Sequence, residues 1–403
     1  MAGLSLCLLV VVGAVAWTLV DSDPYVAPEP PTREDPVDAG DASRTLTALQ
    51  RAVERRDGGG AESLAAEGDV RAARQLRAMV DNADGLGVRD FGLRYVDEAG
   101  AASGDGTWEA SVDATWRFQG FDEAPSNTEV IVRFRRGGDG VDVVGIGGGD
   151  ARTPVWMSGP VTIRRSPDTL VLVAGPAERV AEYERRARVA VTDVRAVLPR
   201  WRTGLVVEVP VDAAGLDQAL DADPGEYAGI AAVTSSTDGS AAPDTPIHVF
   251  LNPDIYNRLK GVGAQVVMSH EAAHVATEAP NTATVPQWLL EGFADYVALR
   301  DVDLPFSVTA GQIIRQVRRD GAPADLPGSV EFGGADTHLG AAYESAWLAC
   351  LVLADRGGED ALVGLYEAMD EGADLGRELG SRFGWTEDAF VAAWRQRLTD
   401  LAG

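Results

Sequence analysis

Hydrophobic positions between residues 42 and 150 follow a helical spacing first and a strand-like spacing afterwards. Leu46, Leu49 and Val53 recur every three or four residues, and a second set with this spacing ends near residue 83. Farther along, apolar and polar residues alternate in four predicted strands, at 91–96, 108–118, 129–134 and 141–146. The segment RRGGDG between the last two strands predicts a hairpin turn. This order predicts helices followed by a curved antiparallel sheet.

The chain from residue 155 onward has a second pattern, in which strands and helices mix before helices take over. Strands are predicted at 161–164 and 169–174 and in GLVVEVP, GIAAVT and IHVFLNP, and helices over about 176–198 and 213–221. After residue 253 nearly every segment has helical periodicity, and the closing helix is predicted to begin at Thr386 as its N-cap. The predicted fold class is therefore α+β. An α+β domain over 42–150 precedes a mostly helical domain with a small sheet over 155–403.

The N-terminal residues predict a targeting segment and a spacer. Residues 2–20 are uncharged and mostly apolar, which suits either a membrane anchor near the lower length limit or a cleaved signal peptide over 1–20. Acidic rather than basic residues follow, which favours export of everything after residue 20. We expect a membrane-anchored protein with extracytoplasmic domains, or a secreted one. Residues 21–41 are rich in proline and acidic side chains and predict a solvated linker.

Charge and cysteine content restrict the chemistry. A net charge of −27, from 35 basic and 62 acidic residues, argues against a nucleic-acid partner, which requires Lys and Arg to neutralise phosphates. The two cysteines, Cys7 and Cys350, both lie in apolar stretches, so a disulfide between them is implausible and Cys350 is expected to be a buried thiol. A metal site would have to use histidine and carboxylate ligands.

The segment HEAAH at 270–274 holds two of the four histidines in the chain. It lies in a predicted helix without internal proline, so His270 and His274 are one turn apart and point the same way. Both imidazoles can reach one ion, while Glu271 lies beside it without being a ligand, where a base that activates water belongs. The competing interpretation is a pair of ordinary helix-surface histidines. We expect the third histidine, His248, to be a partly buried strand residue.

A third protein ligand is required for such a site, and the next predicted helix contains a candidate. In VPQWLLEGFADYVAL at 285–299, Glu291 is an acidic residue within an apolar run. Asp295 follows one turn later on the same face. A carboxylate at that position can accept the distal N–H of a ligating histidine and hold its tautomer.

These two segments, HEAAH and WLLEGFA at 288–294, resemble the gluzincin metallopeptidases of the peptidase MA superfamily. The likeness is nearest to the aminopeptidase N and thermolysin-like branches. It implies a zincin-like fold, Zn²⁺ bound by His270, His274 and Glu291, Glu271 as general base, and Asp295 supporting a histidine. Two departures are the absence of a G-x-M-E-N stretch, which disfavours an aminopeptidase, and a shorter gap between His274 and Glu291.

The likeness extends to AAYESAWLACLVL at 341–353. Aminopeptidase N relatives have a tyrosine at the start of a similar helix that donates to the oxyanion, which makes Tyr343 a candidate catalytic residue. A tyrosine that merely packs on a helix is the alternative, and His338 is a competing oxyanion donor. The pattern of the 42–150 region resembles the nuclear-transport-factor-2-like (cystatin-like) folds, although it contains no diagnostic motif. Its closing GIGGGD at 145–150 opens no predicted helix and makes a poor phosphate loop.

Taken together, the sequence predicts an exported zinc-dependent metallopeptidase, preferably an endopeptidase, acting on a peptide or protein substrate. The strand IHVFL is expected to form the sheet edge on which an extended peptide pairs. Two alternatives are a non-catalytic exported binding protein with a structural or degenerate metal site, and a metal-dependent hydrolase acting on a non-peptide amide.

Overall fold

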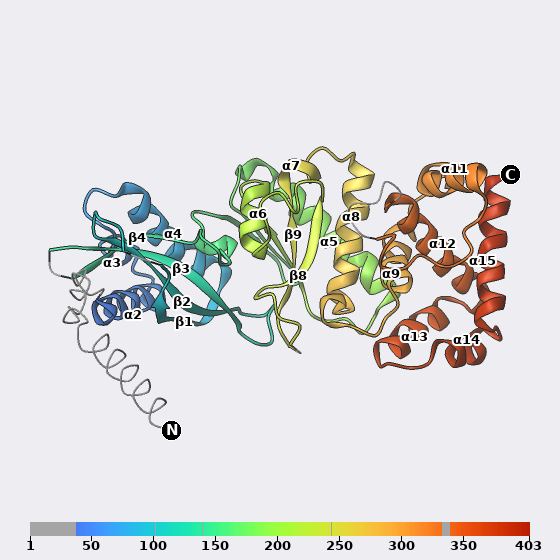
Figure 1. The fold of residues 1–403 in the computed structure, drawn as a ribbon, viewed down its shortest axis with the longest axis horizontal. Helices are drawn as coiled ribbons and strands as arrows, with labels where there is room; N and C mark the ends of the chain where they lie inside the picture. Colours follow the sequence, from blue (N-terminus) through green and yellow to red (C-terminus); the bar gives the residue numbers. More distant parts are fainter. Residues whose placement is uncertain (1–37, 101, 139, 243, 333–338) are drawn as a thin grey trace, which may run out of the picture. The chain divides into compact units, whose positions relative to one another are not determined.

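The computed structural model describes residues 38–100, 102–138, 140–242, 244–332 and 339–403 (Figure 1). Residues 39–403 form one compact unit, to which all the elements below belong. The apolar run at 2–20 and nearly all of the spacer at 21–41 lie outside the described residues. Among the described helices, none has both the length and the apolar character that crossing a membrane requires.

The first part of this unit consists of helices followed by an antiparallel sheet, as predicted. Its elements are α2 (Ala39–Arg55), α3 (Gly58–Glu62), α4 (Val70–Leu86), β1 (Val88–Glu98), β2 (Thr107–Phe118), β3 (Ser126–Arg136) and β4 (Val141–Ile146). The strands pair in the order β1-β2-β3-β4, all antiparallel. Helix α2 begins at Ala39, so the predicted spacer ends a few residues earlier than residue 41.

Alternation along β2 explains how this sheet acquires a buried face. Buried and half-buried residues alternate over the whole strand, and Trp108, Val112 and Trp116 all lie on the buried face. Helices α2 and α4 pack on the sheet, and α4 is fixed at its two ends. Asp69 accepts a hydrogen bond from the Ala72 N–H at the start, and Gly87 adopts a left-handed conformation at the end.

A second sheet lies in the part of the chain after residue 160. It consists of β5 (Thr162–Arg165), β6 (Thr169–Val173), β7 (Leu205–Val209), β8 (Ala232–Ser236) and β9 (Ile247–Leu251). The strand order is β5-β6-β7-β9-β8, in which β6, β7 and β9 are parallel and the two outer strands are antiparallel to their neighbours. The structure therefore has an α+β fold with two small sheets, as the sequence predicts.

The strand order of the second sheet corrects one prediction. The strand IHVFL, expected at the edge, is β9 and lies between β7 and β8. Four of its five residues are buried, as suits an interior strand covered on both faces. The edge beside it is β8, whose three central residues are only half-buried, and the other edge is β5.

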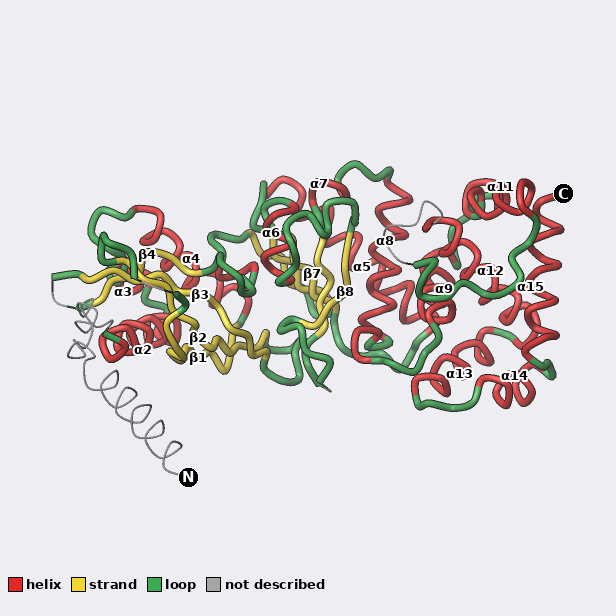
Figure 2. The backbone as a smooth tube through the Cα atoms, viewed as in Figure 1, coloured by secondary structure: helices red, strands yellow, loops and turns green. Residues whose placement is uncertain are grey.

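Helices supply most of the remaining chain (Figure 2). They are η1 (Val155–Met157), η2 (Ala177–Arg179), α5 (Val180–Val197), α6 (Ala213–Leu220), α7 (Pro253–Tyr256), α8 (Gly261–Ala276), η3 (Ala279–Asn281), α9 (Gln287–Leu299), α10 (Phe306–Thr309), α11 (Gly311–Asp320), α12 (Leu339–Gly357), α13 (Glu359–Asp370), α14 (Leu375–Phe383) and α15 (Glu387–Ala402). The prediction of a helical C-terminal region is confirmed. Thr386 caps α15 by accepting a hydrogen bond from the Ala389 N–H, also as predicted.

Helix α9 packs between α8 and α12, and a glycine allows its close approach to α12. A Cβ atom added at Gly292 would lie 2.4 Å from the carbonyl oxygen of Ala346 and 3.0 Å from Sγ of Cys350. Cys350 is buried and free, which confirms the interpretation of it as a buried thiol. The glycine that follows Glu291 therefore determines how deeply this helix sits against its neighbour.

Candidate metal centre

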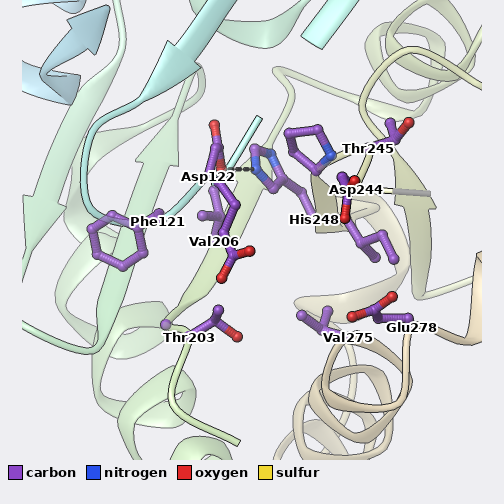
Figure 3. A pocket seen from close by; sticks show the side chains of 13 residues that line it. Phe121, Asp122, Thr203, Val206, Asp244, Thr245, His248, Val275 and Glu278 are labelled. Carbon is purple, nitrogen blue, oxygen red and sulfur yellow. Dashed lines mark hydrogen bonds and ion pairs between the residues drawn. The ribbon is translucent and has the colours of Figure 1, made fainter. Parts of the chain in front are cut away.

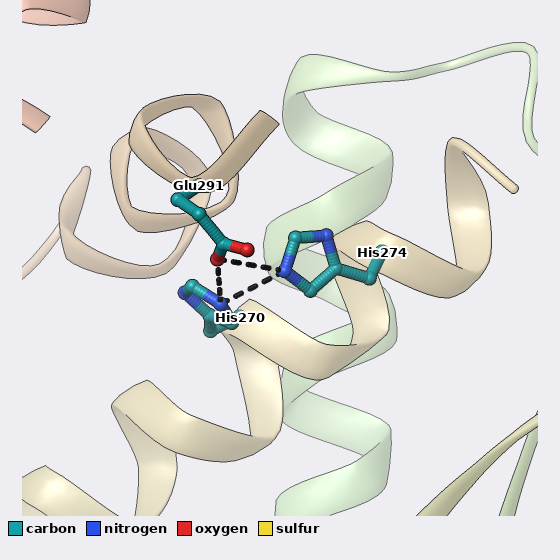
Figure 4. A group of neighbouring side chains, drawn as sticks. All are labelled: His270, His274 and Glu291. Carbon is teal, nitrogen blue, oxygen red and sulfur yellow. Dashed lines mark hydrogen bonds and ion pairs between the residues drawn. The ribbon is translucent and has the colours of Figure 1, made fainter. Parts of the chain in front are cut away.

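Helices α8 and α9 bring three potential ligands together (Figure 4). The Nε2 atoms of His270 and His274 are 2.9 Å apart, and each lies 3.3 Å from Oε2 of Glu291. Within the described residues, this is the group of histidine and acidic side chains whose geometry suits a metal ion. All three side chains are about nine-tenths buried.

The donor set fits zinc. Ligand atoms bound tetrahedrally at about 2.0–2.2 Å lie roughly 3.3–3.6 Å from one another. The observed separations of 2.9–3.3 Å are equal to this or slightly shorter, so a small outward shift of the rings would accommodate the ion. Three lone pairs converging at these distances also repel one another unless a proton or a cation lies among them. Two imidazoles and one carboxylate are a combination that Zn²⁺ prefers.

Contacts outside the three ligands hold two of them in orientation. Nδ1 of His270 lies 2.8 Å from Oδ1 of Asp295, which favours the tautomer that directs the Nε2 lone pair toward His274 and Glu291, where an ion would bind. Gln287 donates from Nε2 to Oε1 of Glu291 at 3.1 Å, leaving Oε2 to face the histidines. Asp295 thus lies where the sequence reasoning expected a supporting carboxylate, whereas Gln287, one turn before Glu291, was overlooked.

Burial and neighbouring charge act in opposite directions on the ionisable groups. Burial disfavours the charged form of His270, but the adjacent Asp295 and Glu291 outweigh it and raise its pKa well above the ordinary value. Burial likewise disfavours ionised Glu291, yet its hydrogen bonds to the two histidines lower its pKa far below the usual range. The carboxylate is therefore ionised, and a metal ion must compete with a proton for His270.

Glu271, the next residue along α8, is buried beside the two histidines and is bound to the second sheet. Thr234 of β8 donates from Oγ1 to Oε2 of Glu271 at 2.6 Å and lies 3.1 Å from its carbonyl oxygen. The sequence reasoning did not identify Thr234, because no spacing relates β8 to α8. Its hydroxyl fixes the rotamer of the proposed base and connects it to the edge strand.

Tyr343 lies near His270, at the start of α12. The centres of their rings are 6.0 Å apart, and Phe332 packs edge-on against the tyrosine at 5.1 Å. Burial and the nearby carboxylates of Glu291 and Glu271 raise the pKa of Tyr343 far above its ordinary value. The phenol therefore keeps its proton and can act only as a donor to negative charge. His338, the competing candidate, lies outside the described residues.

His248 lies apart from the metal ligands and is fully rather than partly buried, which corrects the prediction for it. Its Nδ1 is 2.7 Å from Oε1 of Glu208. Its Nε2 is 3.0 Å from Oδ1 of Asp122, the contact dashed in Figure 3. Burial would lower the pKa of this imidazole, but the two carboxylates outweigh burial and raise it to about 9. The imidazolium therefore joins the turn after β2 to strands β7 and β9.

Sequence reasoning missed both carboxylates of this cluster. The available signal was Glu208, an acidic residue in the otherwise apolar strand LVVEV, where an unpaired charge would be costly. Asp122 gave no such signal. A cavity of about 120 Å³ adjoins the cluster, which is small for an organic ligand.

Comparisons with known proteins add no assignment. No protein-family model matches this chain, and no curated protein has a matching sequence. The function is therefore inferred from the side chains of the metal centre and their contacts.

Proposed function

We propose that this protein is a zinc-dependent metallopeptidase of the gluzincin type, with a zincin-like fold from about residue 155 onward. The observation that carries the proposal is the convergence of His270 Nε2, His274 Nε2 and Glu291 Oε2 within 3.3 Å of one another. Glu271, buried one residue beyond the first histidine, supplies the base that the HEAAH segment requires. We also propose that the helices and the antiparallel sheet of residues 42–150 form a nuclear-transport-factor-2-like domain.

The chemistry proposed for the site is hydrolysis. Zinc held by the three ligands supplies Lewis acidity toward water and toward a carbonyl oxygen. Glu271, oriented by Thr234, takes a proton from the attacking water and passes it to the leaving amine. Tyr343, whose pKa is raised by burial and by the nearby carboxylates, donates a hydrogen bond to the oxygen that becomes negative.

An extended peptide is the substrate class that best suits the surroundings of the metal centre. Strand β8 pairs with β9 on one side only among the described residues, so its other side offers main-chain donors and acceptors. The hydrogen bond between Thr234 and Glu271 links this edge to the proposed base. A chain lying along β8 would thus pass close to the reacting groups. We favour an endopeptidase, and the exported location, membrane-anchored or secreted, remains part of the proposal.

Zinc analysis and a base variant test the proposal together. Purified full chain should contain one equivalent of zinc by elemental analysis and cleave members of a peptide library. Glu271→Gln should keep the zinc but lose activity by about 10²–10⁴-fold, because general-base catalysis typically contributes that factor. Glu178→Gln, the same change at an exposed position in η2, should alter neither property.

The alternatives give different results. If the protein is a non-catalytic binding protein, the wild type and Glu271→Gln would both hold zinc, and neither would cleave any peptide. A hydrolase of non-peptide amides would leave the peptide library intact, yet would turn over amide substrates in a manner sensitive to Glu271→Gln. A wild-type chain that binds no zinc would refute the proposal altogether.

A further inference from the structure

A cavity of about 730 Å³ opens between α4, the glycine-rich segment that follows β4, and α6. This volume falls within the range of cavities that hold small-molecule ligands. None of the residues that line it belongs to the metal centre or contacts a metal ligand. We therefore consider a function for this cavity that is independent of the proposed hydrolysis.

The charge of the lining is opposite to that of the protein. Three arginines line the cavity, Arg71, Arg74 and Arg133, and its lining includes no aspartate or glutamate. The chain as a whole has 62 acidic and 35 basic residues. Positive side chains collected around a hollow in such an acidic protein create a local field that attracts anions.

Two of the three arginines of α4, Arg71 and Arg74, have no acidic partner within the described residues. Arg71 and Arg74 are exposed and one turn apart, which puts their side chains on one face of the helix. Arg77, one turn farther along the same helix, differs: it pairs with Glu62 at 3.3 Å and Asp81 at 3.7 Å. Two guanidinium groups at the cavity are thus available to an external anion.

Arg133 approaches the same cavity from β3. A Cβ atom added at Gly145 would lie 2.9 Å from Nη2 of Arg133, and one added at Gly148 would lie 3.9 Å from Nη1. The guanidinium group therefore lies over the backbone of the glycine-rich segment. Its acidic neighbour, Glu109, is 3.9 Å away, at the limit of an ion pair, and both side chains are 40% exposed. Such a pair is weak and competes little with a ligand.

The segment GIGGGD, set aside above as a phosphate loop, forms one wall. Gly147, Gly148 and Gly149 have φ values of 91°, 82° and 69°, a conformation that other residues rarely adopt. Gly147 also contacts Thr153, since an added Cβ would lie 2.4 Å from its Cγ2. Of the three, Gly147 and Gly148 line the cavity, and the lack of a side chain at Gly148 leaves room beside Arg133.

We propose that this cavity binds a small anionic molecule with at least two phosphate or carboxylate groups, held by Arg71, Arg74 and Arg133. Guanidinium groups recognise both kinds of oxyanion through paired hydrogen bonds. The arginines reach the cavity from two elements, α4 and β3, so each side can hold a separate anionic group. The ligand class does not depend on the metal centre or on whether the protein is an enzyme.

Calorimetric titration of the full chain with pyrophosphate and with citrate tests this proposal and distinguishes phosphate from carboxylate ligands. At least one probe should bind with one-to-one stoichiometry, and the affinity should fall as salt is added. The double variant Arg71→Gln/Arg74→Gln should weaken binding by at least about tenfold, because it removes two charge-assisted contacts. A matched double variant on α2, Arg51→Gln/Arg55→Gln, changes the net charge equally and should stay within about twofold of the wild type.

Three results would overturn the proposal. They are the absence of saturable binding by either probe up to millimolar concentration, equal losses in the two double variants, or no loss in the α4 variant. The substituted arginines of both double variants are exposed, so we expect the thermal unfolding temperature of each variant to equal that of the wild type. A folding defect can therefore be recognised separately from a binding defect.

Discussion

Asp295, one helical turn beyond the proposed ligand Glu291, places its Oδ1 2.8 Å from Nδ1 of His270. Because this contact holds the ring with its Nε2 toward the other two ligands, its loss should weaken metal binding. We expect Asp295→Asn to lower zinc affinity by about 10–100-fold, as is typical when such a supporting partner is removed. Competition with a chromogenic chelator measures the change.

Asp301→Asn is a suitable control for this substitution. Asp301 lies just beyond the end of α9, is largely exposed and pairs with Arg300 at 3.1 Å. The Asp301→Asn substitution should leave zinc affinity unchanged. Equal zinc affinity in Asp295→Asn and the wild type would mean that the Asp295 contact does not support the metal.

Thr234 tests whether the edge strand orients the proposed base. Thr234→Val keeps the shape of the side chain but removes the hydroxyl that donates to Oε2 of Glu271 at 2.6 Å. We expect kcat to fall on the order of tenfold, the effect of one lost hydrogen bond to a charged group, while zinc content stays at one equivalent. Thr234→Ser retains a hydroxyl and should recover most of the activity, whereas equal activity in all three chains would contradict the orienting role.

Gly292 tests the packing that carries Glu291 to the histidines. Gly292→Ala would press a methyl group against the carbonyl of Ala346, so we expect the free energy of unfolding to fall by about 1–3 kcal/mol. Gly263→Ala is the matched control, because that glycine lies in α8 with nothing within 4 Å of an added Cβ. The control should be neutral or more stable by up to about 1 kcal/mol, since alanine favours helix. Urea denaturation distinguishes the two, and equal stabilities would refute the close contact.

His248 predicts a pH dependence of stability. Its pKa is about 9 in the folded protein and about 6.5 in an unfolded chain. A raised pKa means that the charged cluster stabilises the fold fully below pH ~6.5, progressively less between the two values, and not at all above pH ~9. The free energy of unfolding, from urea denaturation between pH 6 and pH 10, should therefore decline more steeply in the wild type than in His248→Gln. Parallel pH profiles would mean that His248 does not titrate in this way.

Local patterns in the sequence determined a large part of this protein. Helical and strand-like periodicity located the strands of both sheets and most of the longer helices, because it reflects which face of a segment is buried. Helices α11, α13 and α14 were predicted only as part of a helical region. The segment HEAAH put two imidazoles on one face because helices have 3.6 residues per turn. A lone glutamate in the apolar run of α9 marked Glu291 in the same way. These features depend on neighbours within a few residues, so they can be deduced without knowing the fold.

Contacts between distant segments were decided only by the tertiary structure. The sequence put β9 at the sheet edge, whereas packing places it inside and leaves β8 outside. Thr234 and Glu271 are 37 residues apart, and Asp122 and His248 are 126 apart, yet each pair is in hydrogen-bond contact. No periodicity encodes such pairs, because their proximity follows from strand order and from how helices pack on a sheet. The proposed ligands were therefore readable from the sequence, but the groups that orient the proposed base and join the two sheets were not.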